Sequence, residues 1–299
     1  MYLFLSSGAT EQYRKDILRA LALPAGAELQ LRYNLRWVAD DIKGRLGLIP
    51  GLEDRRAILA YINHDTDNCL IVPCRKAKLV DISQCGSMVV ALLKLGNFVW
   101  VKDNALAQFN TLIRRLMDKL PHRQEGTIVG AYCAFADGDE WIRADLPLSF
   151  SYSSLAVSEI NVWESIVNQL SCYRDYEKEP YFCMVRGLYP EKSTIGALYD
   201  NGYYELHPGR HQLRLYCYRP EHLPTPDQLP VLGVYPATDL IDMLTDTMVM
   251  INSRYDLKCI DFVVNEPKGS VHSALMLGED WGKNGLPRIY LNIRIKGYD

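Results

Sequence analysis

The chain has 299 residues, of which 48% are hydrophobic and 23% charged, and its formal net charge at pH 7 is −3. These values are ordinary for a globular protein and give no sign of a low-complexity or disordered chain. The longest apolar run, Met88–Leu93, is far shorter than the roughly 20 residues that span a bilayer, so we predict no transmembrane helix.

The first part of the chain shows both strand-like and helical patterns. We predict a strand over Tyr2–Leu5, since these opening residues lack the basic segment and long apolar core of a signal peptide. A helix over Glu11–Leu23 ends at Pro24, and Glu28–Val38 alternates as a half-buried strand with a basic outer face. Further strands are predicted over 57–62, 69–80 and 88–101, and an amphipathic helix over 105–120.

The second part of the chain consists mostly of short alternating stretches typical of strands. A helix over Ser158–Cys172 interrupts them, and a shorter helical pattern covers Asp239–Thr245. We interpret the proline-rich stretch Pro220–Pro236 as a long surface connection or an irregular edge. Strands are predicted over 127–135, 181–187, 202–206, 212–219, 247–251, 259–264, 271–277 and 289–296.

The sign of the charge changes along the chain. Residues 1–124 contain 18 Lys and Arg against 12 Asp and Glu, whereas residues 125–299 contain 15 against 24. The change follows a predicted helix and the breaker Leu120–Arg123, which indicates a domain boundary. The predicted fold class is α+β, with a basic N-terminal mixed α/β domain over 1–124 and an acidic C-terminal antiparallel β-sandwich-like domain over 125–299 that has one inserted helix.

Eight cysteines are dispersed through apolar or strand-like stretches, and no CxxC motif joins any two of them. This distribution is typical of reduced, buried thiols and favours a cytoplasmic protein. The cysteines are Cys69, Cys74, Cys85, Cys133, Cys172, Cys183, Cys217 and Cys259.

Three short stretches collect side chains that can bind metal ions. They are His64, Asp65 and Asp67 with Cys69 and Cys74, the pair His207 and His211, and the acidic turn Asp137–Glu140. Zinc needs four ligands within tetrahedral reach, but Asp residues also build turns and a strand cysteine usually belongs to the core. Pro208–Gly209 makes a tight turn between the two histidines. We therefore expect structural turns, no metal and no cofactor.

Common catalytic fingerprints are missing from the sequence, which contains no GxxxxGK[ST], GxGxxG, HExxH or GxSxG motif. Weaker candidates remain open. A metal-dependent nuclease could use Glu28 with Asp41 and Lys43, or Asp261 with Glu266 and Lys268. A cysteine-dependent hydrolase could use Cys85 with His64 or His122 as its base.

The basic residues of the first domain are the better functional candidates. They could converge into a patch that binds nucleic acid, with Tyr33, Trp37 and Trp100 as stacking groups. The alternation that places Tyr33 and Trp37 with apolar residues, however, indicates core positions. The candidate patch consists of Arg32, Arg36, Arg55, Arg56, Arg75, Lys76 and Lys78, and Arg114–Arg115 could extend it.

The leading hypothesis is a non-enzymatic binding or adaptor subunit that acts with a protein partner in a larger cytoplasmic assembly. It rests on the missing catalytic fingerprints, on the opposite charges of the two domains and on the 19 tyrosines, many of them in the second domain. A nucleic-acid-binding protein is the first alternative, and a metal-dependent nuclease or cysteine-dependent hydrolase is the second. The sequence leaves enzymatic activity open but favours a non-enzyme, and it gives no indication of membrane binding.

Overall fold

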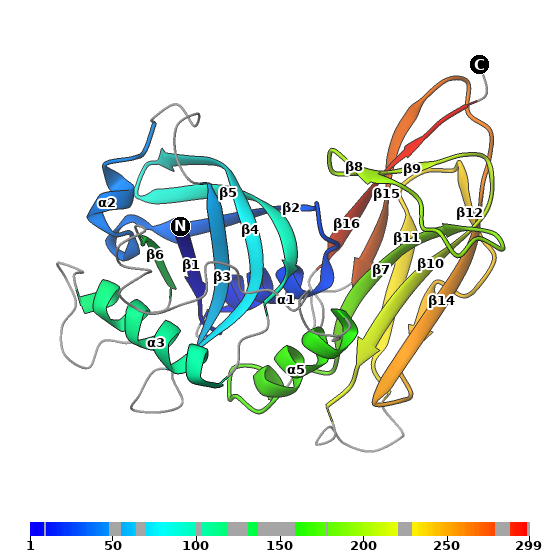
Figure 1. Ribbon diagram of the computed structural model, residues 1–299. Helices are drawn as coiled ribbons and strands as arrows, with labels where there is room; N and C mark the ends of the chain where they lie inside the picture. Colours follow the sequence, from blue (N-terminus) through cyan, green and yellow to red (C-terminus); the bar gives the residue numbers. More distant parts are fainter. Residues whose placement is uncertain are drawn as a thin grey trace. The chain divides into compact units, whose positions relative to one another are not determined.

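The computed structural model describes residues 1–8, 10–47, 55–63, 70–99, 103–118, 131–136, 159–177, 179–220, 229–278 and 288–297. The chain divides into unit 1, residues 1–20 and 28–177, and unit 2, residues 21–27 and 178–299. Strands predominate over helices (Figure 1), which confirms a mixed α+β protein with β-rich sheets. The boundary predicted near residue 124 lies outside the described residues.

Unit 1 is built on a six-stranded sheet in the order β2-β5-β4-β3-β1-β6. β1 and β3 are parallel, and the other neighbours are antiparallel. The strands are β1 (Tyr2–Ser6), β2 (Glu28–Asn34), β3 (Arg56–Asn63), β4 (Leu70–Cys85), β5 (Met88–Phe98) and β6 (Ala131–Phe135). The helices are α1 (Glu11–Ala22), the short 3-10 helix η1 (Leu35–Trp37), α2 (Asp40–Lys43), α3 (Asp103–Asp118) and α5 (Glu159–Ser171).

Both faces of this sheet are covered in part by helices. On one face, Leu3 and Ile58 belong to a buried cluster with Phe109 and other apolar residues of α3. On the opposite face, the ring of Tyr33 stacks on Tyr13 of α1, with 6.3 Å between the ring centroids. The apolar stripe predicted over 105–120 and the burial predicted for Tyr33 are therefore confirmed.

The turn that follows α5 is attached to the loop that follows β1. An Oδ2 atom of Asp175 accepts hydrogen bonds from the Tyr61 hydroxyl and from the Gly8 backbone N–H, both at 2.8 Å. A Cβ on Gly8 would overlap the Asp175 side chain, so this close approach requires glycine. Tyr61 also stacks on Tyr173 at 5.7 Å.

A buried arginine connects α1 to the sheet. Arg75 on β4 is 1% exposed, and its Nε donates to the Gly96 carbonyl at 2.7 Å. Its Nη1 donates to the Ala20 carbonyl of α1 at 2.5 Å, and its guanidinium lies 4.4 Å from the centre of the Phe98 ring. The strand register shifts on both sides of β4 near Arg75, so the regular alternation of the strand is interrupted there.

Unit 2 contains two sheets. The four-stranded sheet has the order β12-β14-β10-β7 and the six-stranded sheet the order β13-β11-β15-β16-β9-β8. The strands of the first are β7 (Phe182–Pro190), β10 (Gly209–Tyr218), β12 (Ile241–Met243) and β14 (Tyr255–Val264). Those of the second are β8 (Tyr199–Asp200), β9 (Tyr203–Leu206), β11 (Val231–Pro236), β13 (Met248–Met250), β15 (Val271–Gly278) and β16 (Ile289–Ile295).

Each of these sheets has one buried and one more exposed face. On β16, Ile289, Leu291, Ile293 and Ile295 are buried, whereas Tyr290 and Asn292 are exposed. The alternation predicted for this strand is confirmed. The helical pattern predicted over Asp239–Thr245 is wrong, because Ile241–Met243 is a strand. Of the two interpretations of Pro220–Pro236, the surface connection is wrong for Val231–Pro236, which is also a strand.

Two elements expected in the second domain belong to unit 1. The helix predicted over Ser158–Cys172 is α5, which lies within unit 1. The described end of the strand predicted over 127–135 is β6, which pairs with β1. Within the described residues, no helix has both the length and the apolar character needed to cross a membrane.

The described cysteines are all free thiols. Burial raises the pKa of the Cys74 thiol to about 12, and Cys133, Cys183 and Cys217 are also buried. Cys85, Cys172 and Cys259 are exposed, so the prediction of buried thiols holds for some of the cysteines only.

We expect Arg75→Lys to destabilise unit 1. A lysine ammonium cannot bond both carbonyls in the same fork geometry or stack on Phe98, so one buried carbonyl loses its donor. The expected loss of unfolding free energy is about 2–4 kcal/mol, measured by chemical denaturation. The matched control is Arg32→Lys at an exposed position, and equal stability of the two variants would contradict the role given to Arg75.

Asp16 makes the stability of unit 1 depend on pH. Its burial raises the pKa from 3.8 to about 6, although Nη1 of Arg19 lies 3.4 Å from Oδ1. The folded state therefore holds the proton more tightly than the unfolded state, so the stabilising contribution is complete below pH 3.8 and is lost as the pH rises through about 6.

Asp16→Asn should remove this dependence. At neutral pH the variant is expected to be more stable than the natural chain by about 1–2 kcal/mol, with the difference disappearing in acid. Denaturation curves across this pH range measure the effect. Asp40→Asn, at an exposed acid, should keep the natural pH profile, and a variant Asp16→Asn that is less stable at neutral pH would show that the Arg19 pair outweighs burial.

Candidate binding sites

The predicted basic patch is divided between the two faces of the unit 1 sheet. Arg75 is buried against backbone carbonyls, so its charge does not belong to a surface patch and its inclusion there was wrong. Lys78 is exposed, and Lys76, two residues before it, is half-buried. This burial lowers the pKa of Lys76.

Three cations form a row across neighbouring strands. Arg56 on β3 lies opposite Lys78 on β4, and Lys78 lies opposite Lys94 on β5. All three side chains are exposed, and we call them the basic row. Within the described part of unit 1, neither Lys78 nor Lys94 has a hydrogen bond or ion pair. Like charges in directly opposed positions repel each other, and at the end of the row Glu28 on β2 lies opposite Lys94.

The remaining members of the predicted patch are not shown to join this row. Arg32 is exposed on the edge strand β2. Arg36 lies in η1 with its guanidinium 4.8 Å from the Trp37 ring, and Arg55 is half-buried just before β3. Trp100 lies outside the described residues.

The catalytic candidates do not assemble as the sequence suggested. Asp41 and Lys43 lie on the short helix α2, not on a strand, and Lys43 pairs with Asp40 at 2.7 Å. Cys85 is exposed at the turn between β4 and β5, and both of its candidate bases, His64 and His122, lie outside the described residues. On β14, Asp261 accepts a hydrogen bond from Gln212 at 2.9 Å, whereas residues 266–268 lie beyond the end of the strand.

The metal-binding candidates do not form a site among the described residues either. His64, Asp65, Asp67 and Cys69 lie outside the described residues, as does the acidic turn Asp137–Glu140. The Nε2 atom of His211 lies 2.7 Å from the backbone carbonyl of His207. Burial lowers the pKa of His211, whose ring stacks on Phe262. In the part of the chain that is described, no three His, Cys, Asp or Glu side chains could share a metal ion.

An apolar surface that the sequence analysis did not identify covers part of the six-stranded sheet of unit 2. The register places Met250 opposite Val231, Tyr235 opposite Met276, and Met276 opposite Tyr290. Met248, Met250 and Tyr290 are 51%, 57% and 52% exposed. We call this surface the Met/Tyr face, and it consists of Val231, Tyr235, Met248, Met250, Met276 and Tyr290.

A glycine shapes the centre of the Met/Tyr face. Gly233 lies between Met248 and Gly278 in the strand register. A Cβ at this position would lie 2.6 Å from the Tyr235 ring and 2.8 Å from the Gly278 carbonyl oxygen. The glycine therefore allows the ring of Tyr235 to fold over its own strand, where its hydroxyl contacts the Met248 sulfur at 2.8 Å.

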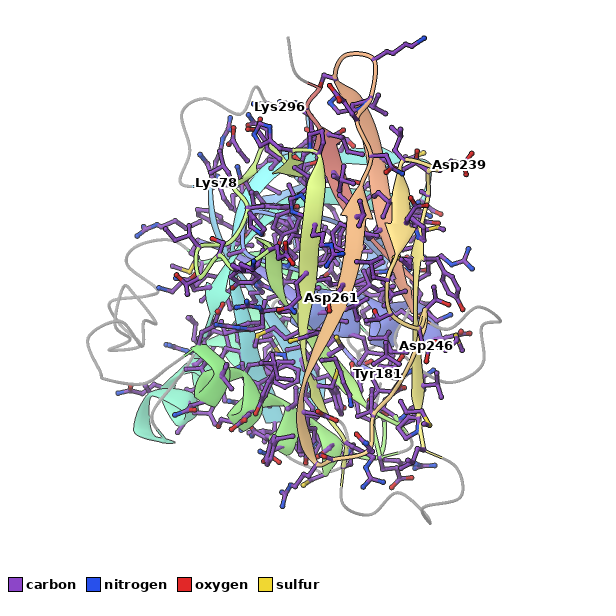
Figure 2. The ribbon with its side chains drawn as sticks, turned by 90° about the vertical axis from the view of Figure 1, so that its right-hand side faces the viewer. Lys78, Tyr181, Asp239, Asp246, Asp261 and Lys296 are labelled. Carbon is purple, nitrogen blue, oxygen red and sulfur yellow. The ribbon has the colours of Figure 1, made fainter. Side chains whose placement is uncertain are left out.

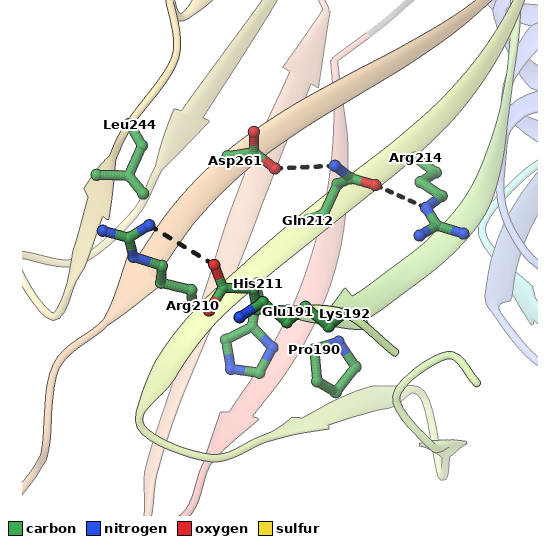
Figure 3. Close-up of a pocket in the computed structure, with 9 residues that line it drawn as sticks. All are labelled: Pro190, Glu191, Lys192, Arg210, His211, Gln212, Arg214, Leu244 and Asp261. Atoms are coloured by element: carbon green, nitrogen blue, oxygen red, sulfur yellow. Dashed lines mark hydrogen bonds and ion pairs between the residues drawn. The ribbon is translucent and has the colours of Figure 1, made fainter. Parts of the chain in front are cut away.

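A pocket of about 470 Å³ lies on the four-stranded sheet of unit 2 (Figure 3). Gln212, in the middle of its polar lining, donates to Oδ1 of Asp261 at 2.9 Å and accepts from Nε of Arg214 at 2.7 Å. Asp261 is labelled on β14 in Figure 2. The lining residues are Pro190, Glu191, Lys192, Arg210, His211, Gln212, Arg214, Leu244 and Asp261.

The sheet register explains how residues distant in sequence meet at this pocket. Gln212 on β10 lies opposite both Asp261 on β14 and Tyr189 on β7. The guanidinium of Arg214 lies 3.9 Å from the centre of the Tyr189 ring. The alternation of Gln212 and Arg214 on the strand predicted over 212–219 was the available signal, but their partners on β7 and β14 could not be assigned without the strand order.

Comparisons with known proteins identify no family for this chain. No protein-family model and no curated protein matches it. Among solved structures, a Bacteroides ovatus GH5 xyloglucanase in complex with a XXXG heptasaccharide is similar, with 8% identity, coverage of 34% of this chain and 18% of that chain, and a TM-score of 0.23. This likeness is too low to support a conclusion about fold or function.

Proposed function

We propose that the protein is a non-enzymatic binding or adaptor subunit that contacts a protein partner through unit 2. The observation that carries the proposal is the distribution of exposed apolar side chains. Every large hydrophobic side chain that is exposed among the described residues belongs to unit 2. In this proposal unit 2 is a β-sandwich-like module, and its Met/Tyr face is the contact surface.

The chemistry of the Met/Tyr face supports a protein partner. Methionine is flexible and polarizable and adapts to irregular surfaces, while tyrosine gives a large contact area at low conformational cost. Large apolar groups that gather on one face remain in water unless another surface covers them. Polar side chains border this face, since Asn292 on β16 is exposed beside Tyr290. An apolar centre with a polar margin is the usual anatomy of an interface.

The test is co-purification of the full chain from its native host under mild conditions. We expect a partner to elute with the natural protein and to be lost in the double variant Met250→Lys and Tyr290→Lys. The expected loss of affinity is at least about tenfold, since central apolar contacts supply most of the binding energy.

Ile195→Lys is the matched control, because Ile195 is 79% exposed and lies outside the Met/Tyr face. This variant should retain the partner. A natural protein that elutes strictly as a free monomer, or equal retention by the double variant, would contradict the proposal.

The basic row favours one second candidate function, the binding of a nucleic-acid backbone by unit 1. Phosphates spaced along a strand could bind Lys78 and Lys94, which lie beside Arg56 in the strand register. The earlier expectation that Arg75 contributes to such a surface is abandoned, because this side chain is buried. Lys94, which the sequence analysis omitted, takes its place.

Lys78→Glu tests the two properties that the basic row affects, the stability of the free protein and its binding of an oligonucleotide. The introduced carboxylate would lie between Arg56 and Lys94, so we expect the free protein to be as stable as the natural chain or more stable, by less than about 1 kcal/mol. Retention of a short oligonucleotide at low salt should fall at least about tenfold. Thermal denaturation and filter binding measure the two effects.

Lys43→Glu changes the net charge equally, but Lys43 pairs with Asp40 on α2. We expect this control to bind the oligonucleotide like the natural chain. Absence of oligonucleotide binding by the natural chain at low salt, or equal losses in both variants, would rule out the basic row as a specific binding site.

A further inference from the structure

The pocket on the four-stranded sheet of unit 2 has a chemistry that neither proposed function uses. It lies on a different sheet from the Met/Tyr face and within one unit. Its volume of about 470 Å³ falls within the range of small-molecule sites. The side chains around it are mainly polar and charged, with Pro190 and Leu244 as the apolar parts.

Arg214 is held in a fixed orientation at one side of the pocket. Its Nε donates to Gln212 at 2.7 Å, and its guanidinium carbon lies 3.9 Å from the centre of the Tyr189 ring. Among the described residues, its two Nη groups have no hydrogen-bond or ion-pair partner. An anchored guanidinium with both Nη groups available matches a carboxylate or a phosphate in a two-pronged geometry.

The charge of the other lining residues also favours an anion. Lys192 has no ion pair within the described part of unit 2. Arg210 pairs with Glu191 at 3.6 Å, and both side chains are at least half exposed, so this pair is weak and can yield to a ligand. The lining holds three Lys and Arg side chains against two carboxylates, which leaves a positive pocket.

The pocket also presents acceptors for hydroxyl groups. Gln212 occupies Oδ1 of Asp261, and the lone pairs of the second carboxylate oxygen remain for the O–H groups of a ligand. Leu244 and Pro190 provide apolar contact for a carbon skeleton. We propose that this pocket binds a small polyhydroxylated anion, a sugar phosphate or a sugar acid, with Arg214 on the anionic group and Asp261 on the hydroxyl groups.

Isothermal titration calorimetry of the full chain tests the proposal with glucose phosphate, glucuronate, neutral glucose and inorganic phosphate. We expect at least one of the anionic sugars to bind at least about tenfold more tightly than glucose or phosphate. Only an anionic sugar presents both an anionic group to Arg214 and hydroxyl groups to Asp261. A preference between glucose phosphate and glucuronate identifies the anionic group. No binding of either at millimolar concentration, or equal binding of neutral glucose, would overturn the proposal.

Substitutions assign the binding to this pocket. Arg214→Ala should reduce the affinity for the anionic sugar at least about tenfold. Lys192→Glu, in an exposed turn, should also reduce this affinity, and it leaves the sheet unchanged. Asp261→Asn should weaken the sugar anion but not inorganic phosphate. Arg294→Ala is the matched control, since Arg294 also lies over a tyrosine ring, at 5.6 Å, on the other sheet of unit 2.

Circular dichroism melting of each variant confirms that it is folded. Unchanged affinity in the folded Lys192→Glu and Arg214→Ala variants would overturn the assignment, as would equal weakening in Arg294→Ala. Tight binding of a hexa-glutamate peptide in place of the small sugars would also overturn it, because the pocket would then be part of a surface for an acidic protein.

Discussion

The burial of Arg75 constrains the rest of unit 1. A guanidinium cannot lose its proton at physiological pH, so its charge must be satisfied where it lies. The guanidinium donates to two backbone carbonyls, one of them from α1, and lies over the Phe98 ring. The position of α1 over the sheet is therefore coupled to this one side chain, which lies where the register of β4 shifts.

The elements of the fold that are determined by neighbouring residues in the sequence could be predicted. The alternation of 289–296 and the apolar stripe of α3 are set by neighbouring residues, and both are confirmed. Val231–Pro236 was missed because Pro236 and Gly233 resemble a loop, yet Pro236 needs no N–H at the end of a strand. β6 belongs to unit 1 because it pairs with β1, and the turn after α5 is bonded to Gly8 and Tyr61; no local pattern contains these long-range contacts.

The candidate sites were harder to predict than the strands. A basic patch inferred from composition treats every Lys and Arg as exposed, but Arg75 on β4 is buried and Lys76 half-buried, whereas Lys78 is exposed. Lys94 was overlooked because its sequence neighbours are apolar. The pocket joins β7, β10 and β14 through their register, so its composition follows from strand order, which the alternation of a single strand does not reveal.

The edges of the six-stranded sheet in unit 2 restrict how a partner could engage it. Its terminal strands, β13 and β8, span only Met248–Met250 and Tyr199–Asp200. Strand addition needs a row of free backbone donors and acceptors, and edges this short offer few of them. They also protect the sheet from joining other chains edge to edge in aggregates. A partner that bound this sheet would therefore have to contact side chains on its face, and single substitutions there would weaken its binding.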